Sequence, residues 1–266
     1  MSFINQKFNE LDQESRFALM PFLMAGDPSL EITAEILLAL QENGADLIEL
    51  GIPYSDPLAD GPIIQLSATR ALRAGTTSIK VLQLLESLKE KINIPIILFT
   101  YFNPLLSFGF NKFCDQASKV GVSGIIIPDL PLEESSQFSD IAKNFNLDLI
   151  LLVAPTTPHD RMKIITKNTN GFTYLVSVTG VTGERNQLEN RVQSLIIKLK
   201  EISSNPVAVG FGISSTKHIK KIQQWGADGA IIGSAFVKRI IESEGNIVVK
   251  NVGKYCKELR LAADES

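Results

Sequence analysis

Short apolar runs recur along the whole chain, and most of them lack a strict alternation of apolar and polar positions. Such runs are typical of strands that are covered on both faces in a parallel sheet. Eight of them lie at 18–25, 47–52, 94–101, 123–129, 147–155, 172–178, 205–212 and 229–234. Amphipathic stretches with helical periodicity separate them, among others at 30–43, 77–91 and 192–202.

The joints between predicted helices and strands resemble one another: GADLIEL at 44–50, GVSGIII at 121–127 and GADGAII at 226–232. In each, a glycine ends a helix shortly before a strand. Eight such units in a chain of 266 residues predict an α/β fold, a TIM (β/α)8 barrel that occupies 1–266 as a single domain. A doubly wound open sheet is the alternative. An amphipathic helix over about 3–11 is expected to cap one end of the barrel.

Composition and charge narrow the classes of function. The chain is 44% hydrophobic and 21% charged, with a net charge of −3, so we expect neither a nucleic-acid nor a membrane partner. The N-terminus has no signal-peptide pattern, and Cys114 and Cys256 stand far apart without metal spacing. A cytoplasmic protein with reduced thiols is expected, or one of the plastid stroma if it is plastid-encoded.

Glu49 is the first candidate for chemistry because it interrupts an apolar strand. Side chains alternate along a strand, so Leu47, Glu49 and Gly51 share one face and Ile48 and Leu50 share the other. The branched residues suit contact with outer helices, which leaves Glu49 pointing into the barrel mouth. A structural ion pair is the alternative, but no lysine or arginine lies near a strand's C-terminal end. We therefore favour a functional carboxylate.

Two aspartates follow in the loop PYSDPLADGP at 53–62. Asp56 precedes Pro57, and a turn-forming role is the simpler interpretation. Asp60 precedes Gly61 and a predicted helix that ends near Gly75. Asp60 therefore fits a catalytic role and a helix N-cap role about equally well, with Gly61 as the other possible cap.

The last three predicted strands end in loops of small residues: 179–184, 210–215 and 233–235. Glycines let backbone N–H groups approach an anion, and helices beginning near Ser214 and Ser234 add favourable dipoles. Loops after strands seven and eight are the usual phosphate site of this barrel. The pattern predicts a small-molecule phosphate ester as ligand.

The sequence lacks the residues that several catalytic mechanisms need. His159 and His218 lie in predicted surface helices, so we expect no metal site. No strand ends in a lysine that could form a Schiff base. Acid–base catalysis by carboxylates remains. Four residues on the predicted strands could contact an apolar part of the substrate: Phe22, Leu98, Ile126 and Leu151.

The segment LIELGIPYSDPLADGPIIQ at 47–65 resembles the signature of the tryptophan synthase alpha chain family. Similar segments span nearly the whole chain in order: 21–28, 126–134, 174–183, 210–214 and 229–235. The resemblance implies a TIM barrel that cleaves indole-3-glycerol phosphate to indole and glyceraldehyde 3-phosphate. It also implies a beta-chain partner that carries pyridoxal phosphate, in an alpha2-beta2 heterotetramer, and no cofactor on this chain.

The resemblance assigns roles to particular positions. Glu49 and Asp60 match the family's catalytic pair. Seven further residues match its substrate-contacting and phosphate-contacting positions: Tyr174, Thr182, Gly183, Phe211, Gly212, Gly233 and Ser234. Val178 departs from those members that carry a basic residue in the lid after strand six. Glu49 is implied to move protons and Asp60 to stabilise positive charge on the indole ring.

A partner surface is expected where large apolar residues fall in a predicted loop, FNPLLSFGF at 102–110. Phe108 and Phe110 could instead pack under the next helix. With the family in view, this loop and the segments 53–57 and 129–134 are the candidates for contact with the beta chain, with Asp56, Asn103 and Pro131 as representatives.

Two other functions remain open from the sequence. One is a non-catalytic barrel that binds a phosphate ligand and acts as a sensor or regulatory subunit. The other is a different isomerase or synthase that acts on a phosphate of the indole pathway.

Overall fold

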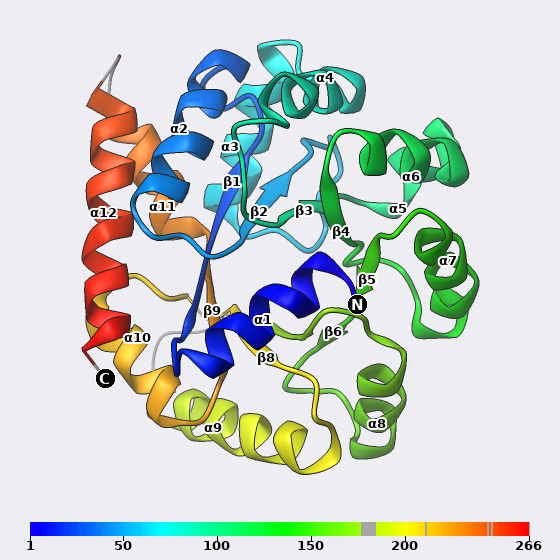
Figure 1. The fold of residues 1–266 in the computed structure, drawn as a ribbon, viewed down its shortest axis with the longest axis vertical. Helices are drawn as coiled ribbons and strands as arrows, with labels where there is room; N and C mark the ends of the chain where they lie inside the picture. Colours follow the sequence, from blue (N-terminus) through cyan, green and yellow to red (C-terminus); the bar gives the residue numbers. More distant parts are fainter. Residues whose placement is uncertain (177–184, 211, 244, 246, 266) are drawn as a thin grey trace.

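A computed structural model describes residues 1–176, 185–210, 212–243, 245 and 247–265 (Figure 1). Nine strands of the described chain form one parallel sheet: β1 (Ala18–Met24), β2 (Ile48–Gly51), β3 (Ile96–Phe99), β4 (Val122–Ile126), β5 (Asp148–Ile150), β6 (Leu152–Val153), β7 (Thr173–Val176), β8 (Val207–Gly210) and β9 (Gly229–Ile232). Their order is β5-β4-β3-β2-β1-β9-β8-β7-β6. Only Leu151 separates β5 from β6, so the two edges of the sheet come from one stretch of chain and the barrel is nearly closed.

The helices surround this sheet (Figure 1). They are α2 (Leu30–Glu42), α3 (Pro62–Arg73), α4 (Ser78–Leu88), α5 (Phe102–Phe108), α6 (Phe110–Lys119), α7 (Leu132–Asn144), α8 (His159–Asn168), α9 (Arg185–Ile202), α10 (Thr216–Gln224), α11 (Ser234–Ile241) and α12 (Ile247–Asp264). One buried cluster fills the space between strands and helices, and a second fills the barrel interior. The predicted TIM barrel is confirmed, with the fifth predicted strand divided at Leu151. In the described part of the chain, no helix is long and apolar enough to cross a lipid bilayer.

Helix α1 (Phe3–Gln13) covers one end of the barrel, as predicted, and crosses it in Figure 1. The hydroxyl of Ser2 accepts a hydrogen bond from the Asn5 N–H and so caps the helix. Ile4 and Phe8 of α1 are buried, and the Phe8 ring lies 5.6 Å from that of Phe172, just before β7. Because Phe172 precedes its strand, α1 covers the N-terminal ends of the strands. The opposite end is left for the loops that follow them.

A buried ion pair ties the end of the chain to this same end of the barrel. Arg260 of α12 donates to Asp46 Oδ2 at 2.8 Å and to the Phe17 carbonyl at 2.9 Å. Asp46, just before β2, also accepts from the Leu19 N–H at 2.8 Å. Both side chains are nearly inaccessible to solvent, so the pair joins α12 to β1 and β2 where water competes little.

Candidate active site

Glu49 points into the barrel, as strand parity predicted. Its strand neighbour Leu47 belongs to the interior cluster, whereas Ile48 and Leu50 belong to the cluster beneath the helices. Glu49 is paired in register with Phe22 of β1 and Ile97 of β3, and its carboxyl group interacts with the charge of Asp60, in the loop that follows β2. The structure therefore sets one carboxylate in an apolar interior, at the end of the barrel away from α1.

The carboxyl group of Glu49 is shielded from water, and no cation of the described chain pairs with it. The residue is 3% exposed, and its Oε2 has no hydrogen-bond partner among the described residues. Burial, and secondarily the negative charge of Asp60, raise the pKa of Glu49 from 4.5 to about 8. At neutral pH the group is therefore mainly protonated, and it can act as an acid.

Asp60 lies in the loop between β2 and α3, where Tyr101 holds it. The Tyr101 hydroxyl donates to the Asp60 carboxylate and accepts from the Ala59 N–H at 3.1 Å. Burial raises the pKa of Asp60 from 3.8 to about 6, and the bond from Tyr101 opposes that shift. Asp60 therefore ionises before Glu49 does, so near pH 7 the site holds one acid and one anion.

The helix-capping interpretation of Asp60 is wrong. Helix α3 has Gly61 as its N-cap, with no side-chain cap bond, and Pro62 as its first residue. Proline suits that position because the first-turn N–H groups need no intrahelical partner. Gly61, the other possible cap, holds the position, and the Asp60 side chain is left for the site.

Glycines make room for aromatic rings at the barrel mouth. A Cβ atom at Gly51 would lie 2.8 Å from the Phe22 ring, and one at Gly210 would lie 2.8 Å from the Tyr174 hydroxyl. Phe22 and Tyr174 both belong to the interior cluster, with Glu49 on the neighbouring inward face of β2. Burial and the charges of Glu49 and Asp60 raise the pKa of Tyr174 well above its usual value, so its hydroxyl stays protonated.

The predicted set of apolar contacts is half wrong. Phe22 and Ile126 line the interior, but Leu98 and Leu151 pack under the helices. Along β3 the inward side chains are Ile97 and Phe99, because positions alternate and Ile97 is in register with Glu49. The Phe22 and Phe99 rings meet edge to face, with centroids 5.9 Å apart.

Part of the predicted phosphate site can be placed. Gly233 is the N-cap of α11 and Ser234 its first residue, directly after β9, and Gly212 follows β8 with a φ of 39°. Helix α10 begins at Thr216, two residues beyond the expected Ser214. Backbone N–H groups at the start of α11 are thus available to an anion. Thr182, Gly183, Phe211 and the lid position Val178 lie outside the described residues.

The histidines and acidic groups form no metal centre in the part of the chain that the structure describes. His218 of α10 accepts a hydrogen bond at Nδ1 from the Ser214 N–H at 3.2 Å, so its ring closes the start of that helix. His159 is exposed at the start of α8. These placements agree with the surface roles expected of both.

The apolar segment 102–110 is not a loop, contrary to expectation. It forms α5 and the start of α6, which Gly109 separates with a φ of 87°. Pro104 is tolerated in the first turn of α5. The ring of Phe110 packs against Phe138, and that of Phe108 against Phe113. Leu106 stays 52% exposed, so the segment offers a smaller apolar surface than the sequence suggested.

The three candidate partner segments nevertheless lie together. Asn103 donates to the Tyr54 hydroxyl at 3.1 Å, and the Phe102 N–H donates to Asp129 Oδ1 at 2.9 Å. These bonds link the segments after β2, β3 and β4 at the barrel end that carries Glu49. Asp56, Asn103 and Pro131 are exposed there. Leu58, 91% exposed, adds a large apolar group.

Two features of the site were missed from the sequence. Tyr101 shares strand parity with Ile97 and Phe99, a signal that could have placed it inside the barrel. The second is an ion pair that joins the end of β1 to α3. Asp27, which is 1% exposed, accepts hydrogen bonds from Arg70 Nε at 2.7 Å and from the Ser67 hydroxyl. Arg70 lies in a helix that is distant in sequence from Asp27. A search for lysine and arginine near the ends of strands therefore could not reveal this ion pair.

Comparison with known proteins agrees with this geometry. Residues 8–263 match the family model described as tryptophan synthase alpha chain. The chain is 70% identical to the tryptophan synthase alpha chain of Prochlorococcus marinus subsp. pastoris, over 100% of this chain and 95% of the relative. It is 52% identical to that of Synechococcus elongatus, over 99% and 98%.

Solved structures give the same result. Tryptophan synthase subunit alpha from Legionella pneumophila superposes with a TM-score of 0.90 at 32% identity, covering 100% of both chains. A chain of tryptophan synthase from M. tuberculosis, in an aminoacrylate-bound form, gives 0.88 at 30% identity over 99% of this chain and 100% of the other.

Proposed function

This chain belongs to the tryptophan synthase alpha chain family, and we propose that it cleaves indole-3-glycerol phosphate to indole and glyceraldehyde 3-phosphate. Membership in the family makes it a lyase of tryptophan biosynthesis. One observation carries the proposed reaction: the carboxyl group of Glu49 is buried at the barrel mouth, pairs with no cation of the described chain, and is raised in pKa to about 8.

Retro-aldol cleavage needs a place for the electron pair of the breaking C–C bond. Indole can supply it, because a proton delivered to C3 converts the ring to an indolenine, an iminium-like acceptor. Glu49, protonated at neutral pH, gives that proton. As a carboxylate it then takes the proton of the glycerol hydroxyl; the C–C bond breaks, the aldehyde forms, and the electron pair restores the indole ring.

Asp60 supports the same step as an anion. The positive charge of the protonated indolenine is largest near the ring nitrogen, and a carboxylate beside that N–H stabilises it. A pKa of about 6 keeps Asp60 mainly ionised at pH 7. Phe22, Phe99 and Tyr174 offer aromatic and apolar surface to the indole ring, next to Glu49.

The phosphate of the substrate fits the glycine-rich end of the barrel. The N-terminus of α11, at Gly233 and Ser234, and the turn at Gly212 supply backbone N–H groups and the positive end of a helix dipole. We assign Thr182, Gly183 and Phe211 to the same phosphate and substrate contacts on the family resemblance.

A beta chain is the partner that the family implies. We propose that it carries pyridoxal phosphate, receives the indole, and assembles with this chain as an alpha2-beta2 heterotetramer in the cytoplasm, or in a plastid stroma if the chain is plastid-encoded. The contact surface is the exposed end formed by the segments around Asp56, Asn103 and Pro131. The bonds that join these segments support a single continuous surface.

The test is indole release from indole-3-glycerol phosphate by the purified chain, with and without a beta chain. Cleavage that requires an intact Glu49 supports the proposed reaction. A non-catalytic regulatory barrel would bind the phosphate ester and release no indole under either condition. A different indole-pathway isomerase or synthase would convert a neighbouring phosphate and leave this one unchanged.

A further inference from the structure

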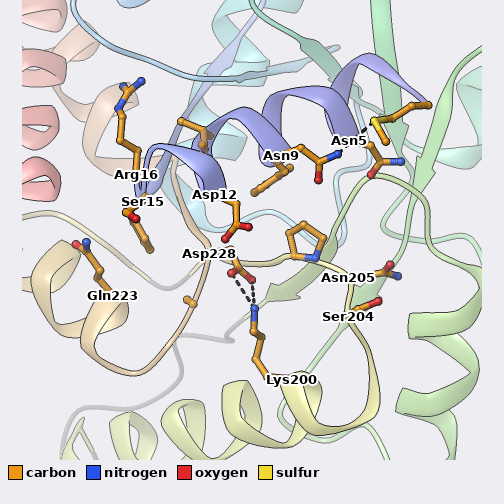
Figure 2. A pocket seen from close by; sticks show the side chains of 16 residues that line it. Asn5, Asn9, Asp12, Ser15, Arg16, Lys200, Ser204, Asn205, Gln223 and Asp228 are labelled. Atoms are coloured by element: carbon orange, nitrogen blue, oxygen red, sulfur yellow. Dashed lines mark hydrogen bonds and ion pairs between the residues drawn. The ribbon is translucent and has the colours of Figure 1, made fainter.

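A second pocket lies at the opposite end of the barrel from Glu49. It measures about 760 Å³ and opens between α1 and the segments that precede β1, β8 and β9 (Figure 2). Phe8, Leu11, Phe17 and Pro206 contribute an apolar floor. Polar side chains form the walls, and the chemistry proposed for the active site uses none of them.

The two cationic side chains of this pocket, Arg16 and Lys200, already have partners. Lys200 Nζ lies 2.8 and 2.9 Å from the two carboxylate oxygens of Asp228. Arg16 contacts Glu14 at 3.0 Å and Asp46 at 3.2 Å. In Figure 2 the Arg16 guanidinium points away from Asp228 and Lys200. An anionic ligand would therefore have to break an ion pair to gain a cation here.

Three carboxamides of the pocket direct their nitrogens toward the protein. Asn205 Nδ2 donates to the Thr166 carbonyl at 2.7 Å, and Gln223 Nε2 donates to the Ala263 carbonyl at 3.3 Å. Asn9 Nδ2 contacts the sulfur of Met1 at 3.2 Å. Each of these three amides thus uses an N–H within the protein and leaves its oxygen as an acceptor. The Gln223 oxygen is buried without a donor among the described residues.

Asp12 adds a carboxylate without a partner. No hydrogen bond or ion pair involves its side chain within the described chain, and the residue is exposed. Figure 2 shows it reaching from α1 toward the side of the pocket that carries Asp228 and Lys200. Within the described chain, the pocket therefore offers one unpaired carboxylate, several acceptor oxygens and an apolar floor, and its two cationic side chains are already paired.

We propose that this pocket binds a small linear diamine or polyamine. One ammonium group pairs with Asp12, further N–H groups donate to the carboxamide oxygens of Asn9 and Asn205, and the methylene chain covers Phe8 and Pro206. The bound amine joins α1 to the segment before β8, so it holds the capping helix on the barrel. The proposal is independent of the cleavage reaction at the other end.

Calorimetric titration of the full chain with spermidine and with putrescine, in 150 mM salt, tests the site. We expect saturable binding of one amine per chain and a rise in melting temperature. Asp12→Asn should weaken binding by about tenfold or more, because it removes the one charge-assisted contact. Asp140→Asn is the matched control: it removes another exposed carboxylate, on α7, with the same change in net charge.

The outcomes separate the possibilities. Equal weakening by Asp12→Asn and Asp140→Asn would mean that the amine responds only to overall charge, and the site would be abandoned. Binding of inorganic phosphate in place of amines would overturn the assigned ligand class. Absence of saturable amine binding to a chain that releases indole normally would also overturn the proposal, without touching the proposed function.

Discussion

The Tyr101 hydroxyl donates a hydrogen bond to the carboxylate of Asp60 and accepts one from the neighbouring Ala59 N–H. Tyr101 lies just beyond β3, whereas Asp60 lies in the loop after β2. The ring of Tyr54 packs against that of Tyr101, with centroids 5.4 Å apart. The loop that carries Asp60 is therefore held from the neighbouring strand, and the hydrogen bond favours the anionic form of Asp60.

Replacing Tyr101 by phenylalanine should alter the pH profile of indole release. The wild-type profile should be bell-shaped, rising as Asp60 ionises near pH 6 and falling as Glu49 loses its proton near pH 8. Tyr101→Phe removes the bond that lowers the pKa of Asp60, so the acidic limb should move to higher pH. The alkaline limb should stay in place. An unchanged acidic limb would mean that Asp60 is not the group that titrates there.

Replacing Glu49 by glutamine should nearly abolish cleavage while substrate binding persists. Glutamine keeps the shape of the side chain but can neither give nor take the proton, so kcat should fall by about a thousandfold or more. Single-turnover indole release and equilibrium binding of a substrate analogue measure the two effects separately. Substantial turnover in this variant would exclude Glu49 as the proton carrier.

The same variant should change the pH dependence of stability. The pKa of Glu49 rises from its ordinary value of 4.5 to about 8 in the folded chain, so the folded state binds more protons between these values. The stability that the group contributes is complete below 4.5 and is lost as pH rises through about 8. Relative to wild type, Glu49→Gln should unfold at a higher temperature at pH 8.5 and at a similar one at pH 4.5. If the difference in melting temperature between Glu49→Gln and wild type were the same at pH 4.5 and pH 8.5, burial would not be raising the pKa of Glu49.

Replacing Asp60 by asparagine should reduce cleavage without unfolding the chain. Gly61 is the N-cap of α3, so the Asp60 side chain is not needed to start that helix. Loss of the anion beside the ring nitrogen should lower kcat by about a hundredfold, the range for removing one electrostatic stabiliser. The melting temperature should change little. A large drop in melting temperature would show that the side chain has a structural role instead.

The alternation of side chains along a strand predicted which residues face the barrel interior only in strands where a polar residue identified the inward face. Glu49 identified the inward face of β2, because a carboxylate and a glycine on one face cannot be mistaken for the branched face. In β3 both faces are apolar, so no residue type distinguishes them, and Leu98 was assigned to the wrong side; Leu151, which lies between β5 and β6, was also assigned to the wrong side. Burial on both faces removes the signal.

Other misses come from contacts between distant residues. Asp27 and Arg70 stand 43 positions apart and meet only because α3 packs beside the end of β1. The ring of Phe110 packs against Phe138, 28 positions away, and this contact covers a ring that the sequence placed in an exposed loop. The assignment of 1–266 to a single domain stays a prediction.

The proposed partner surface can be tested through its two exposed leucines. Leu58 is 91% and Leu106 52% exposed, and the segments that carry them are linked through Tyr54 and Asn103. Apolar side chains at the centre of an interface contribute most when they become buried. The double variant Leu58→Asp, Leu106→Asp should therefore weaken binding to the beta chain by about a hundredfold, because each aspartate would have to lose its hydration there. Titration calorimetry with purified beta chain measures this.

Leu261→Asp is the matched control for that pair, because Leu261 is 55% exposed on α12, across the barrel from α5 (Figure 1). It should leave the affinity for the beta chain unchanged. The melting temperatures of both variants should stay close to that of the wild type, since none of the three side chains belongs to the core. If the double variant binds as tightly as wild type, or if Leu261→Asp weakens binding as much, the beta chain contacts another face and the assignment of Asp56, Asn103 and Pro131 falls with it.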